Sequence, residues 1–228
     1  MEITTSYTCD YEQVLNKVLK QKTPAPASTT PFRLFVNRTV KRGSDVLLSS
    51  LGLLIISPCL PFIYWKIKRE SSGPGIYRQE RLGKEGKPFQ ILKFRTMYVD
   101  AEKDGPALSS ADDARVTPFG RFLRRWRIDE FPQFINVLKG DMSLIGPRPE
   151  RRYYIDQLAK EEPAIFELFT VRPGITSLGQ VLFGYAENKT QMLQRVKLEL
   201  FYLRNYSLAL DLRIFIYTIR TLLKAEGK

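Results

Sequence analysis

Residues 46–65 form an uncharged, strongly apolar run, VLLSSLGLLIISPCLPFIYW, between Asp45 and Lys66. At a rise of about 1.5 Å per residue, a helix of this length spans about 30 Å, the thickness of the hydrocarbon core of a bilayer. A helix buried in the core of a soluble protein is the alternative, although most surface helices carry charge on one face. The run therefore predicts a membrane-embedded helix.

Two features of this run argue against a simple crossing. Pro58 and Pro61 each remove a backbone donor and disfavour helix at the preceding residue, and the Ser57 hydroxyl can bond a carbonyl freed by the break. Both flanks are basic, so the positive-inside rule draws both ends to the cytoplasm; the residues are Arg38, Lys41, Arg42, Lys66, Lys68 and Arg69. We expect a re-entrant hairpin over residues 36–70, broken at Ser57 and Pro58, with a spanning helix as the alternative.

The hairpin divides the chain into three parts. Residues 1–35 contain a segment rich in Pro, Ser and Thr and are expected to be a poorly ordered extension. Residues 71–228 are expected to form a compact α/β domain, mostly helical with a small sheet. A strand is predicted over 89–96, with Lys93 and Arg95 on one face, and helices over 119–126, 128–140, 151–162, 191–206 and 210–224. The last two have apolar faces suited to a membrane interface.

The amino-acid composition excludes several types of catalytic and metal site. The 228 residues include no histidine, which excludes Ser-His-Asp and Cys-His nucleophile systems and His-based zinc sites. Cys9 and Cys59 lie far apart, so a disulfide framework or a structural zinc is not expected. The net charge of +12 attracts polyanions: nucleic acid, anionic lipid or phosphorylated substrates. Carboxylates, Lys, Arg, hydroxyls or a metal held by oxygen ligands must carry any reaction.

The densest group of reactive residues runs from Arg121 to Glu150. Asp129 and Glu130 follow three arginines at the predicted start of a helix, where the macrodipole (up to about 1 kcal/mol) and the guanidinium groups keep Asp129 ionised. The same helix terminus can receive a phosphate, and Pro147 and Pro149 fix the backbone around Arg148. An anionic carboxylate beside a phosphate pocket suits attack on phosphorus, with Mg²⁺ offsetting the repulsion. A helix N-cap remains the alternative for Asp129.

Five stretches of the chain carry a family resemblance. They read RLGKEGKPF (81–89), KFRTM (93–97), DEFPQ with NVLKGDMS (129–133 and 136–143), GPRPE (146–150) and VRPGIT (171–176). From residue 41 to 223 the chain resembles the bacterial sugar transferase family, the monotopic phosphoglycosyl transferases, and in length it is similar to their minimal form. Where family members usually read Gly-Ile-Thr-Gly, then Leu or Trp, then Ala-Gln, this chain has Gly174-Ile175-Thr176 followed by Ser177-Leu178-Gly179-Gln180.

The resemblance implies a reaction and roles for named residues. Asp129 would attack the β-phosphorus of a UDP-sugar, release UMP and form a phosphosugar-aspartyl ester. Polyprenyl (undecaprenyl) phosphate would then accept the phosphosugar, in the first membrane step of glycoconjugate assembly. Glu130 would complete a catalytic dyad, as a base toward the acceptor, and Mg²⁺ would bind at Asp129. Arg124 and Arg148 would contact substrate phosphates, as would Lys93 and Arg95.

The resemblance also implies a location: the bacterial inner membrane, with the catalytic domain on the cytoplasmic face, in contact with membrane lipid but not nucleic acid. It is compatible with a homodimer. Two alternatives stay open. Asp129 could serve as a metal ligand only, with direct attack by the acceptor phosphate. The chain could also be a non-enzymatic, membrane-anchored polyanion-binding protein, although it has no RNA-binding signature or helix-turn-helix pattern.

Overall fold

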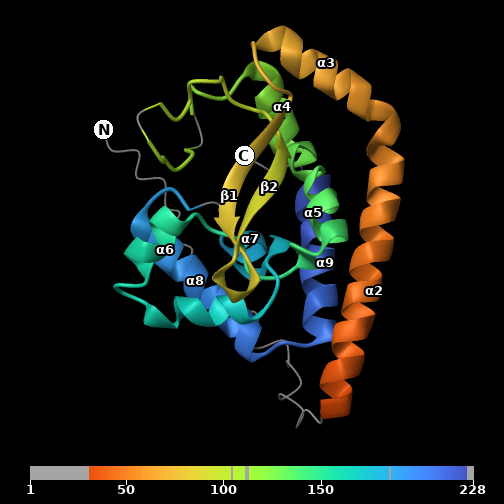
Figure 1. Cartoon of the computed structure of the whole chain (residues 1–228), viewed down its shortest axis with the longest axis vertical. Coiled ribbons are helices and arrows are strands. Elements are labelled where there is room, and N and C mark those ends of the chain that lie inside the picture. The colour runs from red at the N-terminus through yellow and green to blue at the C-terminus, as the bar shows by residue number, and fades with distance from the viewer. Residues whose placement is uncertain (1–30, 104, 111–112, 185, 225–228) are drawn as a thin grey trace.

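A long bent helix runs along one side of the molecule (Figure 1). The computed structural model describes residues 31–103, 105–110, 113–184 and 186–224. Helix α2 (Pro31–Ile56) leads into a 3₁₀ turn, η1 (Ser57–Cys59), and then into α3 (Leu60–Glu70). A poorly ordered extension was predicted over residues 1–35. Of these, residues 1–30 lie outside the described residues. Residues 31–35 already belong to α2, so the helix begins earlier than predicted.

The break falls where it was predicted. Ser57 and Pro58 form the 3₁₀ turn, and the Ser57 hydroxyl donates a hydrogen bond of 2.8 Å to the Leu54 carbonyl. The helical stretch Arg38–Glu70 is long and apolar enough to cross a membrane, and only 11% of its most apolar part is buried against the protein. The alternative of a buried core helix is therefore wrong.

Two small sheets complete the mostly helical fold. Strand β1 (Ile76–Leu82) pairs antiparallel with β2 (Pro88–Phe94) through a tight turn at Lys84–Gly86, in which Glu85 has a positive φ of 61°. Strands β3 (Ser143–Ile145) and β4 (Gly174–Thr176) pair in parallel. The predicted strand over 89–96 is present as β2 but ends two residues earlier, and β1, β3 and β4 were not predicted.

Among the helices predicted from the polar and apolar pattern, two have different bounds in the structure. The expected helix over 128–140 is a 3₁₀ turn, η3 (Ile128–Glu130), followed by a shorter α5 (Gln133–Lys139) that ends at Gly140 with a φ of 93°. The expected helix over 151–162 is shortened to α6 (Arg152–Leu158) and is followed by η4 (Pro163–Thr170). Helices α4 (Pro118–Arg125), α8 (Lys189–Arg204) and α9 (Leu208–Leu223) were predicted, whereas α7 (Leu178–Leu182) was not.

Polar contacts hold α2 against α5 and α9, beside which it runs in Figure 1. The Arg42 guanidinium donates to the Val137 and Leu138 carbonyls at the end of α5, at 2.7 and 3.1 Å. Lys41 pairs with Asp211 of α9 at 2.7 Å. The two Arg42 bonds satisfy free carbonyls at the C-terminus of α5 with a cation, which the helix dipole also favours. Part of the basic flank is therefore engaged with the protein.

The end of α3 is tied to two other elements. The Arg95 guanidinium, just beyond β2, donates to the Ser71 and Ser72 carbonyls, both at 2.7 Å. The Glu70 carboxylate accepts the Phe119 backbone N–H at the start of α4, at 3.0 and 3.1 Å. The C-terminal end of the bent helix is thus fastened to the residue after β2 and to α4.

Candidate functional site

A cavity of about 310 Å³ lies beside the β1–β2 hairpin. Its volume falls at the lower end of the range of small-molecule sites. In the antiparallel register Lys93 is opposite Tyr77, so these two residues share a face of the hairpin with Gln79 and Arg81, and all four line the cavity. The cationic lining residues are Arg81, Lys93, Arg95, Arg124, Arg148, Arg151 and Arg195, against the acidic Glu102, Asp129 and Glu150. The excess of cations suits an anionic ligand such as a diphosphate.

Asp129 is 7% exposed and lines this cavity. Among the residues that the structure describes, none forms a hydrogen bond or an ion pair with its carboxylate. The alternative of an N-cap is wrong, because the cap positions of η3 and α5 are Arg127 and Pro132 and neither helix start is capped by a side chain. The carboxylate is thus left open toward the cavity.

The environment of Asp129 differs from the one predicted. Burial raises its pKa to about 6, and the charge of Glu130 acts in the same direction. The nearby cations Lys93, Arg124 and Arg127 act against both effects without overcoming them. The sequence pattern placed Asp129 at an exposed helix terminus, where desolvation is small, so the effect of burial on its pKa was not included.

Glu130 is surrounded by cations. Its carboxylate lies 3.2 Å from Lys93 Nζ, 3.7 Å from Arg127 Nη1 and 3.9 Å from Arg148 Nη1. Burial raises the pKa of Glu130, but these three cations outweigh it and lower the pKa to about 2. Glu130 is therefore held as an anion, and its strong pairing makes it a weak proton acceptor. Its ion pairs also allow Glu130 to orient Lys93 and Arg148.

Arg124 and Arg148 both reach the cavity, from α4 and from the loop after β3. Arg124 donates to the hydroxyls of Thr96 and Ser109, both at 2.8 Å. Arg148 Nη1 donates to Gln180 Oε1 at 3.2 Å. The structure thus brings Asp129 together with Lys93, Arg124 and Arg148 around one cavity.

Arg95 is placed differently. It borders the cavity, but both terminal nitrogens of its guanidinium donate to main-chain carbonyls at the end of α3. We therefore correct its predicted role as a phosphate contact: its bonds fasten the end of α3 instead. The strand pattern placed it beside Lys93, but β2 ends at Phe94 and the alternation ends with it.

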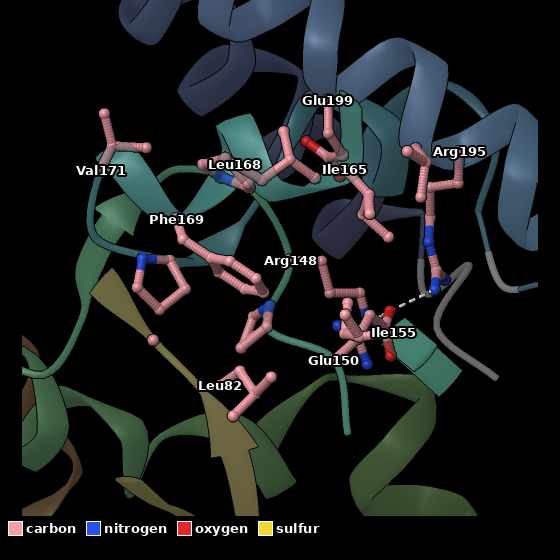
Figure 2. A pocket seen from close by; sticks show the side chains of 15 residues that line it. Leu82, Arg148, Glu150, Ile155, Ile165, Leu168, Phe169, Val171, Arg195 and Glu199 are labelled. Carbon is pink, nitrogen blue, oxygen red and sulfur yellow. Dashed lines mark hydrogen bonds and ion pairs between the residues drawn. The ribbon is translucent and has the colours of Figure 1, made fainter. Parts of the chain in front are cut away.

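Sequence reasoning missed a second cluster of charges, centred on Glu150. This carboxylate lies 3.1 Å from Arg81 and 3.9 Å from Arg148, and it accepts a hydrogen bond from Arg195 of α8 at 2.5 Å. Arg148, Glu150 and Arg195 also line a second cavity of about 30 Å³, which Figure 2 shows with the dashed Arg195–Glu150 contact. The PRPE motif was the available signal for Glu150, but the positions of Arg81 and Arg195 depend on tertiary contacts.

The expectation that Mg²⁺ binds at Asp129 depends on which metal-ligating side chains lie nearby. The described residues contain no group of three or more acidic or Cys side chains able to enclose a metal. Mg²⁺ is often held by one or two carboxylates together with substrate phosphates. An open carboxylate that lines the cavity is compatible with that arrangement, in which Asp129 would be the protein ligand.

Comparison with known proteins identifies the family. The model of the bacterial sugar transferase family matches residues 36–225, which is most of the chain. The chain belongs to the bacterial sugar transferase family. All the site residues described above lie within the matched segment.

Named relatives of this sugar transferase support the assignment. It is 43% identical over 188 residues to the UDP-N-acetylgalactosamine-undecaprenyl-phosphate N-acetylgalactosaminephosphotransferase of Aeromonas hydrophila, covering 82% of this chain and 44% of that protein. It is 42% identical over 191 residues to the UDP-glucose:undecaprenyl-phosphate glucose-1-phosphate transferase of Caulobacter vibrioides (82% and 71%). The protein of the same name from Escherichia coli K12 is 41% identical over 186 residues (81% and 40%). This sugar transferase therefore spans less than half the length of the Aeromonas and Escherichia coli proteins.

Proposed function

We propose that this bacterial sugar transferase is a phosphoglycosyl transferase that moves a sugar 1-phosphate from a UDP-sugar to undecaprenyl phosphate and releases UMP. The observation that carries the proposal is the Asp129 carboxylate, open to a cation-lined cavity in a member of this family. The names of the relatives supply the donor and acceptor classes. They also disfavour the alternative of a non-enzymatic polyanion-binding protein.

The proposed reaction has two steps. An oxygen of Asp129 attacks the β-phosphorus of the donor, and the bond from that phosphorus to the bridging oxygen breaks, so that UMP leaves with the electron pair. The phosphosugar is then an aspartyl ester. An oxygen of undecaprenyl phosphate attacks the same phosphorus, which frees the Asp129 carboxylate and yields the undecaprenyl diphosphate sugar.

The surrounding residues would support both steps. A pKa near 6 leaves most of the Asp129 carboxyl groups ionised at neutral pH, while burial removes the water that would otherwise solvate the nucleophile. Lys93, Arg124 and Arg148 would stabilise the charge on the phosphate oxygens. Asp129 would hold Mg²⁺, and the ion would supply neutralisation of the negative charge on the donor. The role of Glu130 as a base toward the acceptor stays a prediction from the resemblance, and its ion pairs favour an orienting role.

The test is transfer from UDP-N-acetylgalactosamine and from UDP-glucose to undecaprenyl phosphate, with UMP release as the readout. Asp129→Asn should abolish turnover, and near wild-type turnover would remove Asp129 as nucleophile. Mass spectrometry of the enzyme with donor but no acceptor separates the two mechanisms. The covalent route leaves a phosphosugar adduct on Asp129, whereas direct attack by the acceptor leaves none. Asp156→Asn, at an exposed carboxylate on α6, is the matched control.

We also propose that α2 and α3 form a re-entrant hairpin in the inner membrane, with the catalytic domain at the cytoplasmic face. The 3₁₀ turn at Ser57–Cys59 supports the bend, and the helix exposes most of its apolar surface. Helix α9 also exposes apolar side chains that suit contact with lipid: Leu212, Phe215, Ile216, Ile219 and Leu223.

A further inference from the structure

The C-terminal half of α3, where the chain leaves the proposed membrane segment, has an exposed face of aromatic and basic side chains. Tyr64 and Trp65 are exposed, and so are Lys68 and Arg69, which follow them one helical turn later. Lys68 Nζ lies 5.8 Å from the centre of the Tyr64 ring, and Arg69 Cζ lies 5.3 Å from the centre of the Trp65 ring. These cation–π contacts order the two basic side chains but leave their positive charge in place.

Helix α4 repeats the same spacing. Arg121 and Phe122 are followed one turn later by Arg125 and by Trp126 at the C-cap, and all four side chains are exposed. Since residues four apart share a face of a helix, the two arginines and the two aromatic rings form one continuous face. Within the part of the chain that the structure describes, neither Arg121 nor Arg125 forms an ion pair with an acidic side chain. Their charge is therefore available to a ligand.

The two faces belong to helices that pack together. Ile63 and Ile67 of α3 are buried in one apolar cluster with Leu123 of α4, and Figure 1 shows α4 below the end of α3. Because these buried side chains lie on the sides where the helices meet, the aromatic and basic side chains remain on the outer sides. The turn η3, which carries Asp129, begins three residues after α4 ends. The exposed surface therefore extends from the membrane segment to the segment that precedes the candidate nucleophile.

The composition of this surface indicates the chemistry of its partner. We call it the α3–α4 surface, and its residues are Tyr64, Trp65, Lys68, Arg69, Arg121, Phe122, Arg125 and Trp126. Four cations next to a membrane segment attract anionic lipid, at about 1 kcal/mol for each cation near the bilayer surface. Tyr and Trp favour the boundary between headgroups and acyl chains. Nucleic acid would match the cations alone, whereas a bilayer also matches the aromatic rings and the adjoining apolar helix.

We propose that the α3–α4 surface binds the phosphate headgroups of anionic phospholipids, such as phosphatidylglycerol, in preference to zwitterionic phospholipids. The aromatic rings enter the interface, and the guanidinium and ammonium groups contact the lipid phosphates. The inference rests on the proposed placement of α2 and α3 in the membrane and adds to it a selectivity for lipid charge. It also gives a role to the part of the basic flank that has no contact with α5 or α9.

The two tryptophans of the chain, Trp65 and Trp126, both belong to this surface and so provide the measurement. In the variant Trp65→Phe, fluorescence reports on Trp126 alone. The purified full chain is reconstituted into bilayers of equal parts phosphatidylglycerol and phosphatidylcholine. Bromine, which quenches tryptophan on contact, is carried on the acyl chains of only one of the two lipids. Both preparations then have the same surface charge, and a difference in quenching measures which lipid lies next to Trp126.

We expect the quenching to correspond to a preference of about tenfold or more for phosphatidylglycerol, the effect of one to two cations near the surface. The preference should fall as the NaCl concentration rises, because salt screens exposed charges. Equal quenching by the two brominated lipids would overturn the proposal. Quenching by neither lipid would show that α4 lies away from the bilayer and would overturn it as well.

Replacing both arginines of α4 tests the contribution of the cations. Arg121→Gln combined with Arg125→Gln should lower the preference about fivefold or more, whereas an unchanged preference would contradict the role of this surface. The matched control is Arg78→Gln combined with Arg152→Gln, which removes the same charge at exposed positions of β1 and α6 and should keep the original preference. The salt dependence of the unsubstituted surface tests the proposal without any change to the arginines.

Failure of this proposal can be distinguished from failure of the proposed membrane placement. The variant Trp126→Phe leaves only Trp65, which lies within the apolar segment. Quenching of Trp65 by both lipids, together with no preference at Trp126, would overturn the lipid selectivity and leave the membrane placement standing. Absence of quenching at Trp65 would contradict the membrane placement itself, and the lipid selectivity with it.

Discussion

At the scale of single residues, the site depends on how each charge is surrounded. Asp129 and Glu130 are adjacent and both buried, yet burial dominates the pKa of one and cations dominate the pKa of the other. Three of the groups around Glu130 are cations within 4 Å, whereas the Asp129 carboxylate faces the cavity. Such opposite shifts in a neighbouring pair are a common mark of a reactive site.

Glu199 gives a prediction about stability and pH. Burial raises its pKa to about 7, above the model-peptide value of about 4.3. The folded state therefore keeps the proton when the unfolded chain has already released it, so the carboxyl group destabilises the fold increasingly as pH rises from about 4 to 7. Glu199→Gln removes this pH-dependent destabilisation and keeps an acceptor for the Ser177 hydroxyl.

We expect the free energy of unfolding of Glu199→Gln, relative to wild type, to increase between pH 5 and pH 8 by up to about 3 kcal/mol. Urea unfolding followed by circular dichroism at the two pH values measures the difference. Glu167→Gln serves as control, since that carboxylate is 47% exposed and pairs with Arg204 at the surface. A difference that stays constant with pH would contradict the raised pKa.

At the scale of elements, the long-range contacts of helix α2 are specific enough to test. Arg42 closes the C-terminus of α5, the helix that follows the Asp129 turn. Replacing it by Met leaves two carbonyls without their charged donor.

We expect Arg42→Met to lower stability by about 1–2 kcal/mol, the range for a charge-assisted bond at a helix C-terminus, visible as a fall in Tm. Arg38→Met removes an exposed basic residue one turn earlier on α2 and should leave Tm unchanged. Equal unfolding temperatures for the two variants would mean that the Arg42 contacts add nothing to stability.

The elements also show what a sequence can and cannot predict. Helices α8 and α9 start and end within two residues of their predicted limits, because their periodicity is long and Asn188 and Ser207 cap them. The three-residue strands β3 and β4 were missed, since they pair across 31 positions of sequence and carry no local alternation. Asp129 and Arg148 were found from local motifs, but Arg81 and Arg195 meet Glu150 only in three dimensions.

At the scale of the whole molecule, the question is which side of the membrane each end of the chain occupies. A re-entrant hairpin places both chain ends on the cytoplasmic side, whereas a spanning helix places them on opposite sides. The bend at Ser57–Cys59 favours the first arrangement.

We expect epitope tags at both termini to react with antibody only after the inner membrane of spheroplasts is opened. A protein with a known periplasmic terminus provides the positive control for outside labelling. An N-terminal tag that is labelled in intact spheroplasts would show that the helix crosses. The variant in which Pro58 and Pro61 are both replaced by Leu should shift the population toward that outcome, because it restores a continuous apolar helix.

The contacts at the end of α3 affect where the catalytic residues lie relative to the lipid surface. Glu70 and Arg95 join the end of the hairpin to α4 and to β2, the elements that carry Arg124 and Lys93. If the hairpin sits in the bilayer as proposed, its depth fixes the height of these two cations above the lipid, and so the level at which a headgroup meets Asp129. Lengthening or shortening the hairpin by one turn would move that level by about 5 Å, more than the reach of an attacking oxygen. The membrane-embedded segment would then set the position of the active site relative to the bilayer, so that the reaction takes place at the depth of the lipid phosphate.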